Sequence, residues 1–306
     1  MVVINDRIKE VKSATSQRFH AVWQNNFTAN GQAISKNQGI RPLKGKFKDI
    51  PVILIGAGPS LDRNIEFLHI AADKSVLIAS DASLQPLLKE GISPSFVVCL
   101  DPQAEISKFF QGINTQPFNL IAPTIIHPKV LSIWEGRVIF YNKFAPDIPV
   151  LTKIQELAKQ ILPLTPGGTV LSIAYDFAFQ IGGNPIIFAG QDLSFPEGKG
   201  YTSSTIYGDL DQDEILLREN KHIVLEEDIF NKNIPTNKIM SVSRQWFEWA
   251  FTTWNRPNPA AIINSSEAGI LKNHCNILPL KESVYRHCRK KINVNWQLQK
   301  LLKYKH

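Results

Sequence analysis

The sequence predicts an α/β fold: a three-layer sandwich in which helices cover both faces of a mainly parallel sheet. From Pro51 onward, short apolar runs alternate with segments of helical spacing. This order is typical of strand–helix–strand units joined by right-handed crossovers. The apolar runs are also continuous rather than alternating with polar residues, as expected for strands that are buried on both faces.

The expected elements follow one another in a regular order. Residues 1–48 are predicted to form a helical N-terminal segment, 49–210 the α/β core, and 211–306 a lid and a helical C-terminal region packed on that core. The expected core strands are PVILIGA (51–57), SVLIAS (75–80), SFVVCLD (95–101), FNLIAPT (118–124), GRVIFYN (136–142) and PIIFAGQD (185–192). Helical patterns between them cover 61–72, 82–91, 103–112, 127–136 and 167–183.

The C-terminal region has its own signals. A long helix is expected over 236–254, with Thr236 as a plausible N-cap. The segment AAIINSSEAGIL (260–271) has the pattern of one further short strand and a turn. The last thirty residues have helical spacing.

Composition indicates a globular chain without membrane spans. Of 306 residues, 43% are apolar and 20% are charged, and no run of about 18 apolar residues occurs. The N-terminus lacks the long apolar stretch of a signal peptide. Three cysteines without metal-ligand spacing fit a reducing compartment. We therefore expect a cytoplasmic protein.

The net charge is +7, and part of it lies in the final segment YRHCRKKINVNWQLQKLLKYKH. A basic tail of this kind suits a solvated helix, or contact with an anionic membrane surface. We expect no nucleic acid partner. The positive balance also suits an anionic nucleotide substrate.

The first core strand runs into a glycine-rich turn. Glycines at a strand end permit close backbone approach, and a following helix offers unpaired N–H groups to a phosphate. The turn is neither a Walker A loop nor a complete dinucleotide fingerprint, because no Gly-Lys-Ser/Thr follows and Leu61 stands where the third glycine belongs. The candidate phosphate-binding residues are Gly56, Ala57, Gly58, Pro59 and Ser60.

Polar residues follow the other strands at the same edge of the predicted sheet, where ligands of open parallel sheets bind. Asp81 follows the second strand at the distance of a ribose-binding carboxylate, and Asp101 follows the third. A second group of small residues precedes the long apolar helix over 170–181, and a third ends the sixth strand. These candidate binding residues are Thr165, Gly167, Gly168, Thr169, Gln191 and Asp192.

Two later residues are candidates for catalysis together with Asp192. Tyr201 lies in a probable lid and its hydroxyl can hold a leaving phosphate, whereas His222 follows in a polar loop and can serve as a general base. No cluster has zinc-like spacing, so no metal site is expected from the residues alone.

The chain resembles the MptE-like family, which includes the bacterial motility accessory factor (Maf) glycosyltransferases and the archaeal 6-hydroxymethylpterin diphosphokinases. The residues that carry the resemblance are WQNNFTAN, PVILIGAGPSLDRNIEFL, IASDASLQPLLKEGISPSFVVCLDPQ, GGTVLSIAYDFAFQIGGNPIIFAGQDLSF and AIINSSEAGIL, between Trp23 and Leu271. The chain is much shorter than full Maf proteins.

The family is also similar to the CMP-sialic-acid sialyltransferases, which implies a Rossmann-like sheet. In those enzymes a Gly-Asn-Gly-Pro-Ser-Leu turn and a Ser/Thr-Gly helix start hold CMP, tyrosines after a Gly-Ile-Asp strand end bind the leaving phosphate, and a histidine is the base. Here Tyr201 is the matching tyrosine and His222 a loose match. Ala57 replaces the asparagine of the turn and Asp81 replaces a second asparagine, which leaves the nucleotide base open.

Four functions follow as hypotheses. The first is glycosyl transfer from a nucleotide-activated sugar, a CMP-linked sialic or other nonulosonic acid, to a protein or surface glycan. The second is Mg²⁺-dependent diphosphate transfer from ATP to 6-hydroxymethylpterin, with Mg²⁺ on carboxylates such as Asp101 and Asp192. The others are a non-catalytic nucleotide-binding protein and an NAD-dependent oxidoreductase.

Overall fold

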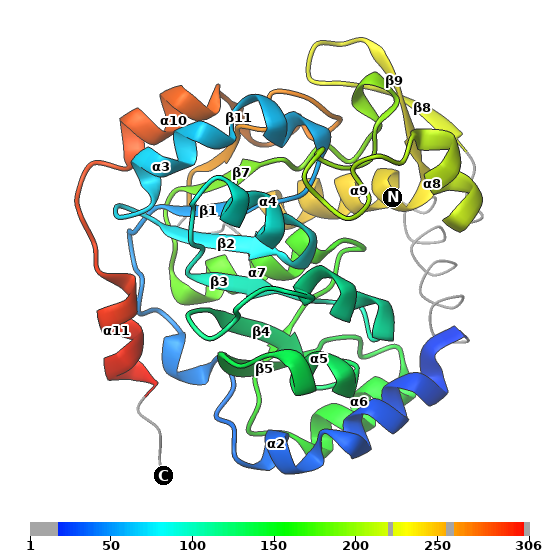
Figure 1. The fold of residues 1–306 in the computed structure, drawn as a ribbon, viewed down its shortest axis with the longest axis vertical. Helices are drawn as coiled ribbons and strands as arrows, with labels where there is room; N and C mark the ends of the chain where they lie inside the picture. The colour runs from blue at the N-terminus through cyan, green and yellow to red at the C-terminus, as the bar shows by residue number, and fades with distance from the viewer. Residues whose placement is uncertain (1–17, 220–222, 255–259, 303–306) are drawn as a thin grey trace.

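The protein is built on one nine-stranded sheet with the order β11-β10-β7-β1-β2-β3-β4-β5-β6. The computed structural model describes residues 18–219, 223–254 and 260–302, and Figure 1 shows the sheet crossing the molecule between layers of helices. All neighbouring strands in it are parallel. The strands are β1 (Val52–Ile55), β2 (Val76–Ser80), β3 (Phe96–Val98), β4 (Asn119–Pro123), β5 (Arg137–Lys143), β6 (Pro163–Leu164), β7 (Ile186–Ala189), β10 (Ile262–Asn264) and β11 (Asn276–Ile277).

The strand order reverses between β1 and β7. From β1 the chain adds β2 to β6 on one side, and it then returns to place β7, β10 and β11 on the other side of β1. This reversal is the topological switch point, where open parallel sheets bind ligands at the carboxyl ends of their strands.

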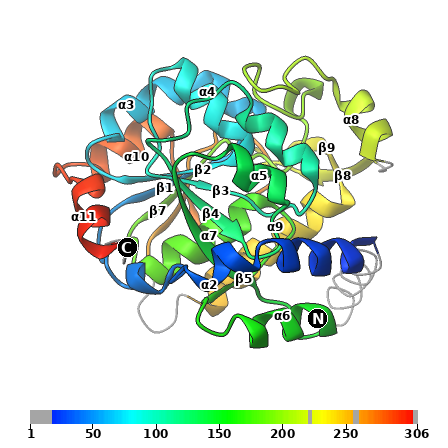
Figure 2. The same ribbon diagram turned by 60° about the horizontal axis from the view of Figure 1, so that its bottom comes forward.

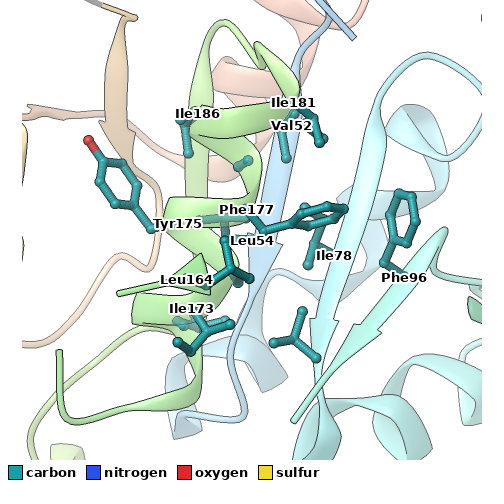
Figure 3. Close-up of a cluster of buried hydrophobic side chains, with 14 of the residues drawn as sticks. Val52, Leu54, Ile78, Phe96, Leu164, Ile173, Tyr175, Phe177, Ile181 and Ile186 are labelled. Carbon is teal, nitrogen blue, oxygen red and sulfur yellow. The ribbon is translucent and has the colours of Figure 1, made fainter. Parts of the chain in front are cut away.

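Successive residues of the central strands point into two different hydrophobic clusters. In β1, Val52 and Leu54 belong to one cluster, and Ile53 and Ile55 belong to the other. Figure 3 shows Val52, Leu54 and Ile78 on the first side together with residues of the long helix that covers them. Burial on both faces explains why the strands are continuously apolar, and it confirms the predicted α/β sandwich.

Helices form the outer layers on the two faces. The first face carries α7 (Val170–Ile181), α9 (Lys238–Thr253) and α11 (Val294–Leu301). The second face carries α3 (Leu68–Ala71), α4 (Leu84–Lys89), α5 (Pro128–Ile133) and α10 (Leu280–His287). Figure 2 shows the sheet edge-on between these layers. The remaining α-helices are α2 (Gly31–Ser35), α6 (Pro149–Leu157) and α8 (Gln212–Glu219), with a further helix over residues 18–29.

Short 3₁₀ helices and one hairpin complete the fold. The 3₁₀ helices are η1 (Arg41–Leu43), η2 (Pro59–Arg63), η3 (Ile65–Phe67), η4 (Asp81–Ser83), η5 (Ala104–Phe110) and η6 (Pro196–Gly198). The antiparallel strands β8 (Ile223–Glu227) and β9 (Asn233–Asn237) form a separate hairpin beside α9. Within the described ranges, no helix combines the length and apolar character required to span a bilayer.

Two local predictions are wrong. The α-helix expected over 61–72 is instead two 3₁₀ turns that break at Asn64 (φ −141°) before the short α3. The Asn64 side chain donates hydrogen bonds to Ser265 O and to the carboxylate of Glu267, and these tertiary contacts override helical spacing. The N-cap of α9 is Asn237, whose side chain accepts from the Met240 amide. Thr236 lies one residue too early, in β9.

Candidate functional site

The glycine turn after β1 packs directly against the end of β7. The amide of Gly56 donates to Ala189 O at 2.8 Å, and that of Gly58 donates to Gly190 O at 2.9 Å. A Cβ atom at Gly56 would lie 2.4 Å from the Gly190 carbonyl oxygen. Glycine is therefore required here because two strand ends approach each other at the switch point. Close backbone approach was predicted, although Gly58 does not use a left-handed conformation (φ −67°).

Asp192 joins the same turn from the end of β7. Its carboxylate accepts from the Ser60 amide at 2.9 Å and from the Ser60 hydroxyl. Burial raises the pKa of Asp192 to about 6, although the two hydrogen bonds from Ser60 favour the ionised form. Asp192 thus holds the glycine turn on the edge of β7.

The turn after β10 supports Asp192 from the opposite side. Ser266 Oγ accepts from the Gln191 amide at 2.9 Å, and the Ile270 amide donates to Asp192 O at 3.0 Å. The carboxylate of Glu267 accepts from Leu280 N at 2.9 Å, at the start of α10. Ser266 and Glu267 were not among the predicted site residues. They follow a short apolar strand, so the rule that ligand sites lie at carboxyl strand ends would have found them.

The predicted lid segment is fastened to the glycine turn. The Thr202 amide donates to Ala57 O at 2.8 Å, and the Ser203 amide donates to Asp62 Oδ2 at 2.9 Å. Tyr201, which precedes Thr202, therefore lies beside the glycine turn. The centroid of its ring lies 5.5 Å from that of the Tyr207 ring. His222 lies outside the described residues.

The start of α7 also reaches the glycine turn. A Cβ atom at Gly56 would lie 3.2 Å from Leu171 Cδ1, in the first turn of α7. The preceding loop is pinned to the helix, because the Thr165 amide donates to Asp176 Oδ2 and the Gly167 amide donates to Ser172 Oγ, each at 2.7 Å. A side chain at Gly167 would meet Trp246 of α9. The fold thus brings the first and second predicted binding segments together.

Three hydrogen-bond donors at this edge have no partner within the described part of the chain. They are the amide of Ala57, the buried hydroxyl of Thr169 and the buried side-chain amide of Gln191. The three groups follow β1, β6 and β7. The two buried donors, those of Thr169 and Gln191, carry a free-energy penalty unless a ligand or water accepts from them. Their common character as donors is suited to an anionic ligand.

A second polar cluster gathers at the ends of β2, β3 and β5. Asp81 is 4% exposed, and its Oδ2 atom has no N–H or O–H partner among the described residues. Burial raises its pKa to about 7, and the nearby charge of Asp101 adds to this effect. The adjacent Cys99 thiol, with a pKa raised by burial, and the hydroxyl of Tyr141, which donates to Cys99 O at 2.8 Å, complete the cluster. The predicted residues Asp81 and Asp101 are thus neighbours.

Lys143 is a further charged group at this edge. It ends β5, and its Nζ atom lies 5.2 Å from the ring centroid of Trp23. Loss of hydration lowers the pKa of Lys143 to about 8, against the opposing charge of Asp101. Lys143 was not among the predicted site residues, although it directly ends an apolar strand and so obeys the strand-end rule.

The carboxylates proposed for Mg²⁺ do not share a ligand set. Asp192 and Asp101 follow β7 and β3, which are separated by β1 and β2. At the usual strand spacing this corresponds to about 14 Å, too far for one ion. Both Asp192 oxygens also accept hydrogen bonds from Ser60. Across the described ranges, no group of three or more His, Cys, Asp or Glu side chains is placed to hold a metal ion.

The sequence that forms this site matches the model of a known family. The family model described as "6-hydroxymethylpterin diphosphokinase MptE-like" matches residues 25–198. The chain belongs to the MptE-like family. The matched range contains the glycine turn, Asp81, Asp101 and the end of β7, so the resemblance to the MptE-like family predicted from the motifs is confirmed.

Two individual proteins are similar to this MptE-like chain. An uncharacterised protein of Treponema pallidum (strain Nichols) is 28% identical over 156 residues, which cover 50% of this chain and 27% of that protein. The solved structure of a Maf glycosyltransferase from Magnetospirillum magneticum AMB-1 has a TM-score of 0.61 at 21% identity, covering 84% of this chain and 37% of that one. The chain thus spans well under half the length of either protein, and the second comparison establishes a shared fold.

Proposed function

We propose that this MptE-like chain is a transferase that moves a sugar from a nucleotide donor, a CMP-linked nonulosonic acid, to a protein or glycan acceptor. The observation that carries the proposal is the set of three donors without partners at the switch point, contributed by Ala57, Thr169 and Gln191. Phosphate oxygens accept hydrogen bonds from such groups. The fold shared with a Maf glycosyltransferase supports the same class of reaction.

The remaining residues have distinct roles in this proposal. The glycine turn and the start of α7 hold the nucleotide phosphate, and Asp81 and Asp101 bind ribose or sugar hydroxyls. Asp192 orients the turn through Ser60. Tyr201, in the segment fastened to Ala57, donates a hydrogen bond to the departing phosphate, where charge develops in the transition state. His222 is the proposed base for the acceptor proton.

A thermal-shift panel of CMP, UDP, GDP, ATP and NAD, with and without Mg²⁺, tests the nucleotide. A ligand at about 100 times its Kd that binds only the folded protein adds roughly 2.7 kcal/mol of stability. We expect CMP to raise the unfolding temperature by several degrees without Mg²⁺. The proposal fails if CMP has no effect, and also if no CMP is released from CMP-sugars with any acceptor.

Thr169→Val is expected to weaken CMP binding about tenfold, because one hydrogen bond to an anion contributes roughly 1.5 kcal/mol. The free protein should be as stable as the parent or slightly more so, since the substitution removes a buried hydroxyl without a partner. Calorimetric titration and urea unfolding measure the two effects. Thr252→Val, on α9 with its hydroxyl bonded to helix carbonyls, is the control and should bind CMP normally.

Tyr201→Phe is expected to lower turnover about a hundredfold while KM for the donor changes only a few-fold, because the phenol acts on the charge that develops on the leaving phosphate. Steady-state CMP release measures both constants. Tyr285→Phe, at an exposed position of α10, serves as the control. Equal losses in both variants would argue against a role for Tyr201 in leaving-group stabilisation.

The family description favours one alternative, diphosphate transfer from ATP to a pterin. In that reaction Asp101 and Asp192 could not both bind the same Mg²⁺ ion directly, because two strands lie between the strands that they follow. Stabilisation by ATP that requires Mg²⁺, with none by CMP, would favour this alternative. CMP binding without turnover, unaffected by Asp192→Ala, would indicate a non-catalytic nucleotide-binding protein.

A further inference from the structure

The excess of positive over negative charge in the chain is concentrated in two short segments. Residues 41–50 contain four basic residues and one acidic residue, and residues 285–302 contain five basic residues and no acidic residue. Their combined net charge of +8 exceeds that of the whole chain, which is +7. The rest of the protein is therefore close to neutral, and the excess is a local feature.

The fold places these two segments beside each other. Val294 and Leu298 of α11 are buried in the same hydrophobic cluster as Leu43 and Phe47. Figures 1 and 2 both show α11 next to the turn that follows α2, at one side of the molecule. The end of α10 leads into α11 along that side (Figure 1). We name the exposed surface of residues 41–50 and 285–302 the basic face.

Few of the charges on the basic face are neutralised. Within the described chain, Arg286 pairs with Glu282 and Lys291 pairs with Asp73 on the neighbouring helix end. Both pairs are solvent-exposed, and such pairs contribute little. The remaining exposed cations of the basic face are Arg41, Lys44, Lys46, Lys48, Arg289, Lys290 and Lys300.

Two large aromatic side chains are exposed among these cations. Tyr285 is 59% exposed and Trp296 is 52% exposed. The Lys300 ammonium lies 3.6 Å from the centroid of the Trp296 ring. Tyrosine and tryptophan are preferred at the headgroup level of a bilayer, where one part of the ring is apolar and another is hydrated.

We propose that the basic face docks on an anionic lipid bilayer. Clustered Lys and Arg are attracted to anionic headgroups, and Tyr285 and Trp296 insert among them. A single-stranded nucleic acid fits less well, because such proteins hold the strand in a charged groove. Two hollows of about 300 Å³ in the described part of the chain lie outside this face, one lined by Glu226, Arg244 and Lys272 and another lined by Phe144 and residues of α6.

The test is co-sedimentation of the full chain with vesicles of phosphatidylglycerol mixed with phosphatidylcholine, and with pure phosphatidylcholine vesicles. We expect binding to the mixed vesicles only, weakening as salt is raised. Simultaneous reversal of Arg289, Lys290 and Lys291 to Glu should weaken binding roughly a hundredfold or more, because each basic residue near the surface contributes about fivefold. Trp296→Ala should weaken it several-fold.

The matched control reverses three exposed lysines outside the basic face, Lys108, Lys129 and Lys153. This variant has the same net charge as the first triple variant, and it should bind the mixed vesicles as tightly as the parent does. Thermal unfolding of all variants checks that they fold. Trp296→Ala changes no charge and tests the face even if the triple variant does not fold. Equal loss in both triple variants, equal binding to pure phosphatidylcholine, or binding of single-stranded DNA without vesicle binding would overturn the proposal.

Discussion

Asp81→Asn is expected to raise the free energy of unfolding at pH 8 by up to about 4 kcal/mol. The Asp81 carboxyl is buried, and its pKa of about 7 in the folded protein compares with 3.8 for the unfolded chain. Each pKa unit corresponds to about 1.4 kcal/mol. Asparagine retains an acceptor for the Ala82 amide, which Asp81 Oδ1 now serves at 2.9 Å, and it carries no charge into the interior.

The sign follows from proton linkage. The folded protein holds the Asp81 proton more tightly than the unfolded chain does. Protonation of Asp81 therefore contributes its full stabilisation of the folded parent below pH 3.8, and this contribution is lost as the pH rises to about 7. The stability difference between variant and parent should therefore be small at pH 4 and largest at pH 8. Urea unfolding at both values measures it, with the exposed Asp213→Asn as control. A variant less stable than the parent at pH 8 would contradict the assignment.

The same substitution should weaken ligand binding. A carboxylate held in the interior at a loss of stability is typical of functional sites, where activity and stability oppose each other. Asp81 Oδ2 has no N–H or O–H partner among the described residues, and a hydroxyl or N–H group of a ligand is a stronger donor than the neighbouring Cys99 thiol. We expect the more stable variant to show a smaller thermal shift with CMP than the parent.

Gly269→Ala is expected to lower the free energy of unfolding by about 4 kcal/mol and to abolish nucleotide binding. Gly269 has φ +87°, and a Cβ atom there would lie 2.0 Å from the Asp192 carbonyl oxygen. Of this loss, the strain of an alanine in the left-handed conformation accounts for about 1–2 kcal/mol, and overpacking accounts for about 1–3 kcal/mol. Because the obstructing atom is backbone, the end of β7 must move, and Asp192 moves with it.

Gly91→Ala is the matched control for this prediction. Gly91 has φ +70°, but a Cβ atom there meets nothing within 4 Å. We expect it to lose only the strain contribution of about 1–2 kcal/mol and to bind CMP normally. Urea unfolding and the thermal shift with CMP compare the two variants. Similar losses in both would show that backbone strain, rather than contact with Asp192, determines the stability at Gly269.

The sheet could be predicted because the apolar composition of its strands indicates that they are buried. Continuous apolar runs such as 52–55 and 76–80 are buried on both faces, and the alternation with helices implied parallel pairing. The two-residue strand β6 has no such signal. The helix predicted over 61–72 failed because Asn64 takes its partners from residues about 200 positions away, and no local pattern records such contacts.

The candidate site was predictable where residues follow a strand directly. Gly56, Asp81 and Asp192 were found by that rule, and the fold brings the segments of Gly56 and Asp192 into contact. The interaction of Asp192 with Ser60 depends on the neighbouring positions of β1 and β7, and the two residues are 132 positions apart in the sequence. Lys143 was missed because a lysine at a strand end is ordinarily solvated, whereas the tertiary packing of this chain buries it and so lowers its pKa.

The position of β1 in the middle of the sheet has a consequence for synthesis of the protein. Its two neighbours, β2 and β7, are separated by more than 100 residues, and the Asp192 loop is completed only by Gly269 and Ile270. During translation the first six strands can pair while one edge of β1 stays open. Contacts of such long sequence separation also slow folding. The edge that we propose to bind the nucleotide is therefore among the last parts of the sheet to close, and a nucleotide that binds there would bind only chains that have finished folding.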